Sequence, residues 1–151
     1  MEKIREILEI KGRQIHSVSP DTTVYDALKL MAEKNIGAVL VLDGTKLRGI
    51  MSERDYARKV VLNGKFSKEV SVEEIMSPEI LCIDPEQNIS VTQAIMTKKR
   101  IRHLPVLDNG ELVGLVSIGD IVNATLEDKT FMIDQLTTYI KGVTIVEKKQ
   151  V

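Results

Sequence analysis

The sequence predicts a mixed α/β (α+β) protein that contains one small unit twice. "LRGIMSERDYARKV" at 47–60 and "LVGLVSIGDIVNAT" at 112–125 share one pattern: an apolar residue, any residue, Gly, two apolar residues, Ser, two others and Asp. A single offset of 65 residues aligns the flanking stretches without a gap, and it places Met31 on Met96. Because one unit is too small to bury its own sheet, we expect the two units to pack through equivalent faces with pseudo-twofold symmetry.

Each unit is predicted to run helix, strand, strand, helix after a short extended segment. In the first unit, apolar residues recur at helical spacing after a turn, and Asp43-Gly44 marks a hairpin between two short strands. A second helix begins at Ser52, and Gly64 is expected to end it. The expected elements are an extended segment at 14–18, a helix within 19–35, strands at 37–43 and 46–51, and a helix at 52–64.

The second unit repeats this order. Its expected elements are an extended segment at 79–83, a helix at 88–99, a strand at 103–108, a turn at Asn109-Gly110, a strand at 111–116 and a helix from Ser117. We therefore divide the chain into an N-terminal helix at 1–11, a first repeat at 12–66, a second repeat with its linker at 67–127, and a C-terminal helix and tail at 128–151. That last helix carries Phe131, Met132, Leu136 and Tyr139 or Ile140 on one side, and the terminal helices are expected to cover an exposed face of this chain or of a partner.

Composition excludes several classes of function. The 151 residues are 43% hydrophobic and 28% charged, with a net charge of −1, so we expect a packed core and no general attraction to nucleic acid or to an anionic membrane. Aromatic residues make up only 3%, and no apolar run approaches the roughly 20 residues of a membrane span. A soluble, cytoplasmic protein is expected. The lone Cys82 has apolar neighbours and is interpreted as a small buried residue, not a nucleophile.

The repeated Ser-x-x-Asp has two interpretations. Ser52 or Ser117 can cap the helix that follows, while Asp55 or Asp120 reaches back to complete a capping box. The same strand-to-helix junction leaves backbone N–H groups unpaired, which favours an anion, and a short Asp can accept bonds from vicinal ribose hydroxyls. Local chemistry therefore permits either a purely structural cap or a site for a ribose phosphate.

Over residues 10–127 the chain resembles the CBS (cystathionine beta-synthase) domain family, arranged as a tandem pair. The resemblance rests on the gapless repeat, on "IGAVLVLDGTKLRGIMSERDYA" and on "IRHLPVLDNGELVGLVSIGDIV". It implies a beta-alpha-beta-beta-alpha unit, which agrees with the order of elements above. The closing "FMIDQLTTYIKG" is similar to the end of small stand-alone bacterial and archaeal CBS-pair proteins.

The resemblance implies two clefts between the repeats that bind adenosyl ligands such as AMP, ADP, ATP, NAD or S-adenosylmethionine. The adenine wall of one repeat would face the Ser/Asp motif of the other. One cleft would join Ile36, Gly37 and Ala38 to Ser117 and Asp120, and the other would join Ile101, Arg102 and His103 to Ser52 and Asp55. The extended segments would contribute Gly12 to His16 and Ser77 to Leu81, and Leu115 and Arg54 complete the expected binding residues.

The two clefts are expected to differ. Arg102-His103 stands in the second repeat where the first has the uncharged Gly37-Ala38. We expect the cleft of Asp120 to be the stronger site, with Arg102 or His103 on a phosphate, although a solvated strand start is the alternative. Arg54 and Arg58 could serve phosphates of the other cleft or of a longer ligand such as NAD, or could form a solvated helix face.

No catalytic set or metal-ligand spacing is visible, and His16 has no companion ligands nearby in the sequence. We therefore expect a regulatory adenine-nucleotide-binding module and not an enzyme, acting as a homodimer on an unknown regulated protein, with no nucleic acid, membrane or metal involved. The alternatives are a structural dimerisation module with unoccupied clefts and a nucleotide hydrolase.

Overall fold

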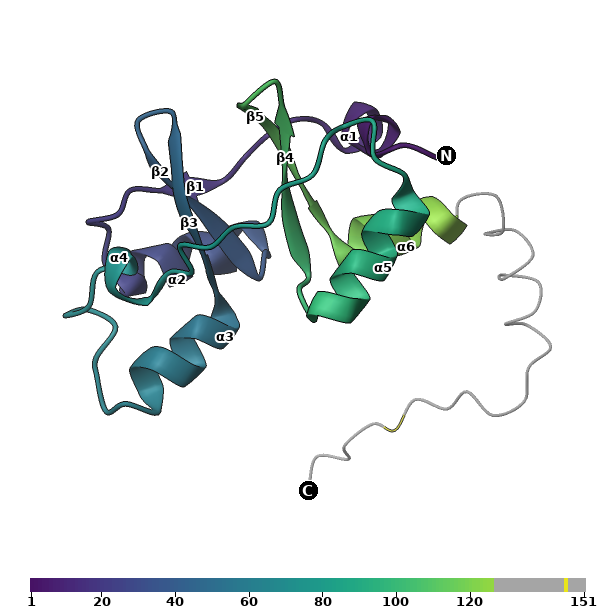
Figure 1. The fold of residues 1–151 in the computed structure, drawn as a ribbon. Helices are drawn as coiled ribbons and strands as arrows, with labels where there is room; N and C mark the ends of the chain where they lie inside the picture. Colours follow the sequence, from purple (N-terminus) through teal and green to yellow (C-terminus); the bar gives the residue numbers. More distant parts are fainter. Residues whose placement is uncertain (127–145, 147–151) are drawn as a thin grey trace.

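The computed structural model describes residues 1–126 and 146. Figure 1 shows two β-sheets side by side, each with helices packed against it. The first part of the chain forms α1 (Ile4–Lys11), β1 (Ser17–Val18), α2 (Val24–Lys34), β2 (Ala38–Asp43), β3 (Lys46–Ser52), α3 (Glu53–Tyr56) and the π-helical turn η1 (Ala57–Val61). The second part forms α4 (Val72–Ile75), α5 (Ile89–Lys99), β4 (His103–Asp108), β5 (Glu111–Ser117) and α6 (Ile118–Leu126). The expected C-terminal helix with Phe131, Met132, Leu136, Tyr139 and Ile140 lies outside the described residues.

The two repeats confirm the predicted mixed α/β fold. In each, two antiparallel strands form a hairpin, β2 with β3 and β4 with β5, and both hairpins carry a register shift at the same place, after Val41 and after Val106. The second hairpin turns through Asn109 and Gly110, both with positive φ, as an Asn-Gly turn requires. Strand β1 adds to the first sheet parallel to β2, whereas the segment before β4 contributes an isolated parallel bridge from Ile83 to Val106.

Helix α2 shows how the sequence sets these elements locally. Thr23 Oγ1 accepts a hydrogen bond from the backbone N–H of Asp26 (3.1 Å) and so caps the first turn. The helix buries Val24, Ala27 and Met31, which are spaced for one face, against the first sheet. It ends at Asn35, which adopts the left-handed conformation that Asn tolerates.

The helix that precedes each repeat in the sequence packs into the core of the other repeat. Ile4, Ile7 and Leu8 of α1 are buried in the core of the second repeat. Val72 and Ile75 of α4 are buried in the core of the first repeat. Helix α1 therefore covers a face of this chain. The two repeats are joined by a reciprocal exchange of helices, in which α1 packs on the second repeat and α4 on the first.

A glycine at the centre of each hairpin makes this exchange possible. A Cβ atom on Gly49 would lie 2.7 Å from Met76 Sδ and 2.9 Å from the carbonyl oxygen of Ser77. A Cβ atom on Gly114 would lie 2.6 Å from Leu8 Cδ2. Gly recurs in the sequence pattern because the incoming segment packs directly on the strand backbone.

The helix after Ser52 differs from expectation. It was predicted as one helix over 52–64, but after four α-helical residues it continues as the π-helical turn η1, in which Leu62 N–H bonds to the carbonyl of Ala57 at 3.1 Å. No Gly or Pro within η1 signals this change. Gly64 adopts a φ of 68° just beyond it, where the end of the helix was predicted.

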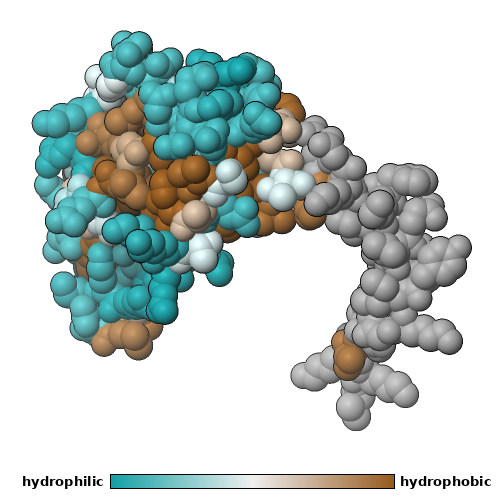
Figure 2. Space-filling view, turned by 45° about the vertical axis from the view of Figure 1, so that its right-hand side comes forward, coloured by the Kyte–Doolittle hydropathy of each residue, from teal (hydrophilic) through white to brown (hydrophobic). Residues whose placement is uncertain are grey.

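Some apolar side chains remain exposed in the described part of the chain. Figure 2 shows a broad hydrophobic area on one face of the molecule, between hydrophilic residues. The exposed apolar residues include Val61, Leu62 and Phe66 in and after η1, and Val122 and Leu126 on α6. Among residues 1–126, no helix is long and apolar enough to cross a membrane.

Substituting the two glycines tests the reciprocal packing. Gly49→Ala is expected to lower the free energy of unfolding by about 1–3 kcal/mol, since the new methyl group meets the backbone carbonyl of Ser77. That carbonyl is held by a hydrogen bond from Ile50 N–H, at 3.2 Å. Gly114→Ala should cost less, because the atoms nearest to its methyl group belong to the side chain of Leu8 and not to a backbone. Urea denaturation of both variants measures the difference, and equal losses would contradict the packing described.

Candidate functional site

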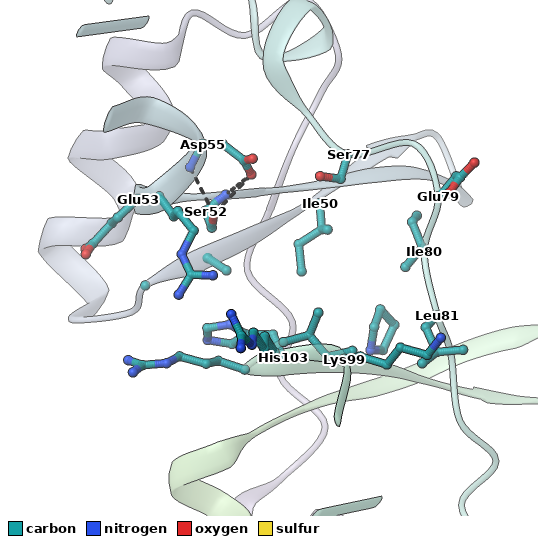
Figure 3. A pocket seen from close by; sticks show the side chains of 17 residues that line it. Ile50, Ser52, Glu53, Asp55, Ser77, Glu79, Ile80, Leu81, Lys99 and His103 are labelled. Carbon is teal, nitrogen blue, oxygen red and sulfur yellow. Dashed lines mark hydrogen bonds between the residues drawn. The ribbon is translucent and has the colours of Figure 1, made fainter. Parts of the chain in front are cut away.

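A cavity of about 890 Å³ lies between the two repeats, and we call it the Asp55 cavity. Figure 3 shows the start of α3 along one wall and His103 on the facing wall. Residues of the first repeat and of the segment after α4 line one part: Gly37, Ala38, Ile50, Ser52, Glu53, Arg54, Asp55, Ser77, Glu79, Ile80 and Leu81. The second repeat contributes Lys99, Arg100, Ile101, Arg102, His103 and Pro105.

Ser52 and Asp55 form a complete capping box at the rim of this cavity. Asp55 Oδ2 accepts hydrogen bonds from Ser52 N–H (2.9 Å) and Ser52 Oγ (3.0 Å), while Asp55 N–H donates to Ser52 Oγ (3.2 Å). Asp55 Oδ1 lies 3.1 Å from Lys59 Nζ, one turn further along, and the carboxylate side chain is only 15% exposed. The structural interpretation of Ser-x-x-Asp is therefore confirmed, and the same box presents Asp55 to the cavity.

We expected the backbone amides at the start of α3 to be unpaired, but three of them donate hydrogen bonds within the protein. The amides of Ser52 and Asp55 are used by the capping box, and Glu53 N–H donates to the carbonyl of Gly37 at 3.1 Å. The reason is register, because β2 begins beside the end of β3 and brings that carbonyl to the helix start. An anion in this cavity would have to be met largely by side chains.

The wall across from Asp55 is formed by the end of α5 and the start of β4. His103 approaches the first repeat, its Cε1 atom lying 3.8 Å from the position of a Cβ atom on Gly37. Burial lowers the pKa of His103 below its usual 6.5; Lys11 and Arg102 also lower it, and Asp120 opposes them. The imidazole is therefore neutral at physiological pH and can donate and accept hydrogen bonds.

Ser117 and Asp120 of the second repeat form a related capping box but pair with a different cation. Ser117 N–H donates to Asp120 Oδ2 at 2.8 Å, and Asp120 N–H donates to Ser117 Oγ at 3.2 Å. Lys11 at the end of α1 reaches the same Oδ2 at 2.6 Å and also donates to the carbonyl of Leu115 at 2.8 Å. Asp120 is thus held by a cation from outside its repeat.

The expected ranking of the clefts stays a prediction. Arg102 and His103 line the Asp55 cavity, and His103 also pairs with Ser117 across the hairpin, where the charge of Asp120 reaches it. The start of β4 faces α3 of the first repeat across the cavity, while Lys11 binds the carboxylate of Asp120. The other expectation, that residues 101–103 face Ser52 and Asp55, agrees with the structure.

The structure gathers most of the predicted binding residues into the Asp55 cavity. Those that line it are Gly37, Ala38, Ser52, Arg54, Asp55, Ser77, Leu81, Ile101, Arg102 and His103. The predicted residues outside its lining are Gly12, His16, Ile36, Leu115, Ser117 and Asp120. Ile36 instead packs against the first core, and the carbonyl of His16 accepts a bond from Leu40 N–H.

Several lining residues were not predicted: Ile50, Glu53, Lys99, Arg100 and Pro105. Glu79 and Ile80 lie within the predicted segment from Ser77 to Leu81. The repeat contains a signal for Ile50, since it corresponds to the predicted Leu115 at the 65-residue offset. The remaining four carry no such signal. Cys82 is half-buried, and burial raises the pKa of its thiol, in keeping with its interpretation as an inert residue. Within residues 1–126, no three His, Cys, Asp or Glu side chains gather as metal ligands would.

Comparison with known proteins shows the class to which this fold and site belong. The CBS domain matches the chain twice, at residues 4–62 and 72–127, so the protein belongs to the CBS domain family and carries a tandem pair of these domains.

Several relatives carry CBS domains. The mitochondrial CBS domain-containing protein CBSX3 of Arabidopsis thaliana is 36% identical over 148 residues, covering 92% of this chain and 72% of the relative. YhcV of Bacillus subtilis is 33% identical over 108 residues, covering 72% and 76%. Among solved structures, a protein with CBS domains from Burkholderia ambifaria is 50% identical, with a TM-score of 0.83 and coverage of 85% of this chain and 97% of that one.

The lowered pKa of His103 predicts a pH effect on stability. Below about pH 6.5 the unfolded chain binds a proton at this residue that the folded chain resists, so stability present above pH 6.5 is lost as the pH falls. His103→Gln should therefore reduce the loss of melting temperature between pH 7 and pH 5. His16→Gln serves as the control. Identical pH profiles for wild type and His103→Gln would contradict the burial of this imidazole.

Proposed function

We propose that this protein is a regulatory module that binds an adenine nucleotide, AMP, ADP, ATP or NAD, in the Asp55 cavity. The observation that carries the proposal is the cavity itself. The cavity is large enough for a nucleotide. It places Asp55, held by the capping box with Ser52, opposite the basic residues 99–102 of the second repeat. Pockets of 300–1,000 Å³ with apolar lining and a few placed polar groups are typical ligand sites.

The lining supports a definite orientation of the nucleotide. Figure 3 places Ile80 and Leu81 at the opposite end of the cavity from Glu53, with Ser52 and Asp55 between them. An adenine ring would lie against this apolar end, which suits a flat base. The ribose hydroxyls would then reach Asp55, whose short side chain can accept two hydrogen bonds.

The proposed regulation follows from the fact that both repeats contribute residues to the lining of the cavity. A ligand in this cavity would contact β3 and α3 of the first repeat together with α5 and β4 of the second. Binding would favour the arrangement of repeats that makes these contacts simultaneously, and a partner protein would respond to that arrangement. The ligand can shift the equilibrium only by its difference in affinity between the arrangements.

One solved relative gives the fold a precedent for this ligand class. The CBS domain pair of MJ0100 was solved in complex with 5′-methylthioadenosine and S-adenosyl-L-methionine, and it is 24% identical with a TM-score of 0.72. At this identity the likeness extends to the fold. For the present chain, the adenosyl ligand is our proposal from the cavity.

Aspartate substitutions test which cleft is used. A nucleotide at about 100 times its dissociation constant should raise the melting temperature by about 5–10 °C. Asp55→Ala should remove most of this shift, because the ribose loses its acceptor. Asp120→Ala is the matched control, since it removes the equivalent capping box and should keep most of the shift.

A thermal shift screen with AMP, ADP, ATP, NAD, NADH and S-adenosylmethionine is the measurement. If none of these ligands shifts the melting temperature, the binding proposal fails and the structural alternative replaces it. If Asp120→Ala abolishes the shift while Asp55→Ala keeps it, the nucleotide lies in the second cleft.

We further propose that the chain acts as a homodimer. Leu62 and Phe66, which are 77% and 69% exposed, lie near each other in sequence after η1, and α6 adds the exposed Val122. A related CBS-CP12 protein, 26% identical, was solved as a hexamer. Light scattering should give twice the chain mass for the wild type and a smaller mass for Leu62→Glu. A wild-type protein of single-chain mass would contradict the dimer.

A further inference from the structure

The capping box leaves one oxygen of Asp55 for a ligand. Oδ2 accepts two hydrogen bonds from Ser52, one from the backbone N–H at 2.9 Å and one from the hydroxyl at 3.0 Å. A carboxylate oxygen has two acceptor positions, so these two bonds fill Oδ2. No donor among residues 1–126 forms a hydrogen bond with Oδ1. The hydroxyls of a ribose would therefore have to be accepted at Oδ1.

The ammonium group of Lys59 lies beside this second oxygen, with Nζ 3.1 Å from Oδ1. Nζ also donates a hydrogen bond to the carbonyl of Ile75, at the end of α4, at 2.9 Å. An exposed ion pair between residues one helical turn apart is normally weak, because both side chains remain mobile. Here the bond to Ile75 ties the ammonium to a second element and so restricts its position next to Oδ1.

The second repeat contains an equivalent link that uses a different lysine. At the 65-residue offset Lys59 corresponds to Ala124, which is buried in the second core. The cation comes instead from Lys11 of α1, which bonds to Asp120 and to the carbonyl of Leu115. In both repeats one ammonium thus ties the capping-box aspartate to a helix of the reciprocal exchange. Because the two lysines are not equivalent in the sequence, the repeat alone does not account for this link.

Helix capping does not account for the link either. The capping box needs only Oδ2 of Asp55, and Ser52 supplies both bonds to that oxygen. Lys59 lies in the middle of η1, and single π-helical turns occur frequently at functional sites. Lys59 is outside the lining of the Asp55 cavity, so its ammonium reaches a ligand only through Asp55. These observations give Lys59 a role at Oδ1, the oxygen that the ligand would use.

We propose that Lys59 is a positioning residue for the ribose, which holds Oδ1 of Asp55 where it accepts the 2′- and 3′-hydroxyls. The inference rests on the proposed nucleotide binding, and it adds a residue that the ligand does not touch. The bond from Nζ to the carbonyl of Ile75 fixes the ammonium before the ligand arrives, so little ordering is left for the binding step. Lys59 thereby gives the cavity its preference for nucleotides that carry both ribose hydroxyls.

The test compares AMP with its 2′,3′-dideoxy analogue, which lacks both hydroxyls. Lys59→Met keeps the aliphatic part of the side chain and removes the ammonium. The ratio of AMP affinity to dideoxy-AMP affinity should fall about fivefold, since only AMP has the hydroxyls that Oδ1 accepts. Both ligands carry the same phosphate, so the loss of one positive charge cancels in this ratio. Isothermal titration gives the affinity of AMP, and displacement of AMP gives that of the analogue.

Two control variants remove a lysine elsewhere. Lys11→Met removes the corresponding ammonium from Asp120 and should leave the ratio unchanged. Lys65→Met removes one positive charge from an exposed residue just after η1, outside the cavity lining, and should also leave it unchanged. The side chains of Lys59 and Lys11 are 44% and 36% exposed, so neither substitution leaves a buried cavity. ATP and its dideoxy analogue replace the AMP pair if ATP binds more tightly.

The outcomes separate this inference from the proposed function. If the wild type binds no adenine nucleotide, both fail. If the wild type binds AMP and its dideoxy analogue equally, or if Lys59→Met leaves their ratio unchanged, nucleotide binding stands and the role of Lys59 is overturned. If Lys11→Met lowers the ratio and Lys59→Met does not, the ribose lies at Asp120, which contradicts both the inference and the proposed site.

Discussion

The structure depends on a reciprocal packing contact between the two repeats. Leu8 of α1 packs on Gly114 in the second repeat, and Met76 after α4 packs on Gly49 in the first. Each core thus contains side chains that precede the other repeat in the sequence. This exchange fixes how the repeats face each other, and it places the end of β3 opposite the start of β4. The Asp55 cavity is the space that this arrangement leaves between them.

The same exchange makes the surroundings of Asp55 and Asp120 unequal. Both repeats end their second strand in a Ser-Asp capping box, so the backbone at Asp55 and Asp120 is alike. The cation beside each carboxylate differs in origin. Lys59 comes from the helix that Asp55 itself begins, whereas Lys11 is delivered to Asp120 by α1. The same local pattern, present in both repeats, therefore yields one aspartate beside a cavity lined with cations and one aspartate paired with the packed helix α1.

The 65-residue repeat was sufficient to predict the fold class and the hairpins, and the Ser-x-x-Asp spacing predicted the capping boxes. The pairing of residues 101–103 with Ser52 was predicted from the resemblance to the CBS family. The repeat could not show where α1 packs. Leu8 contacts Gly114 and Met76 contacts Gly49, so these two side chains play equivalent parts, but they are 68 residues apart and do not align at the 65-residue offset. Nor could the repeat show that Lys11 binds Asp120 or that Arg102 lines the Asp55 cavity.

The central claim is that an adenine nucleotide binds between the repeats, in the Asp55 cavity. Methyl NMR of the protein labelled at Ile and Leu tests it most directly, since such residues line the cavity and also lie near Lys11 and Asp120. On addition of ATP, we expect the largest shifts at Ile50, Leu81 and Ile101, which line the cavity, and small shifts at Leu8 and Leu115. Large shifts at Leu8 and Leu115, with Ile50 and Leu81 unmoved, would contradict the account.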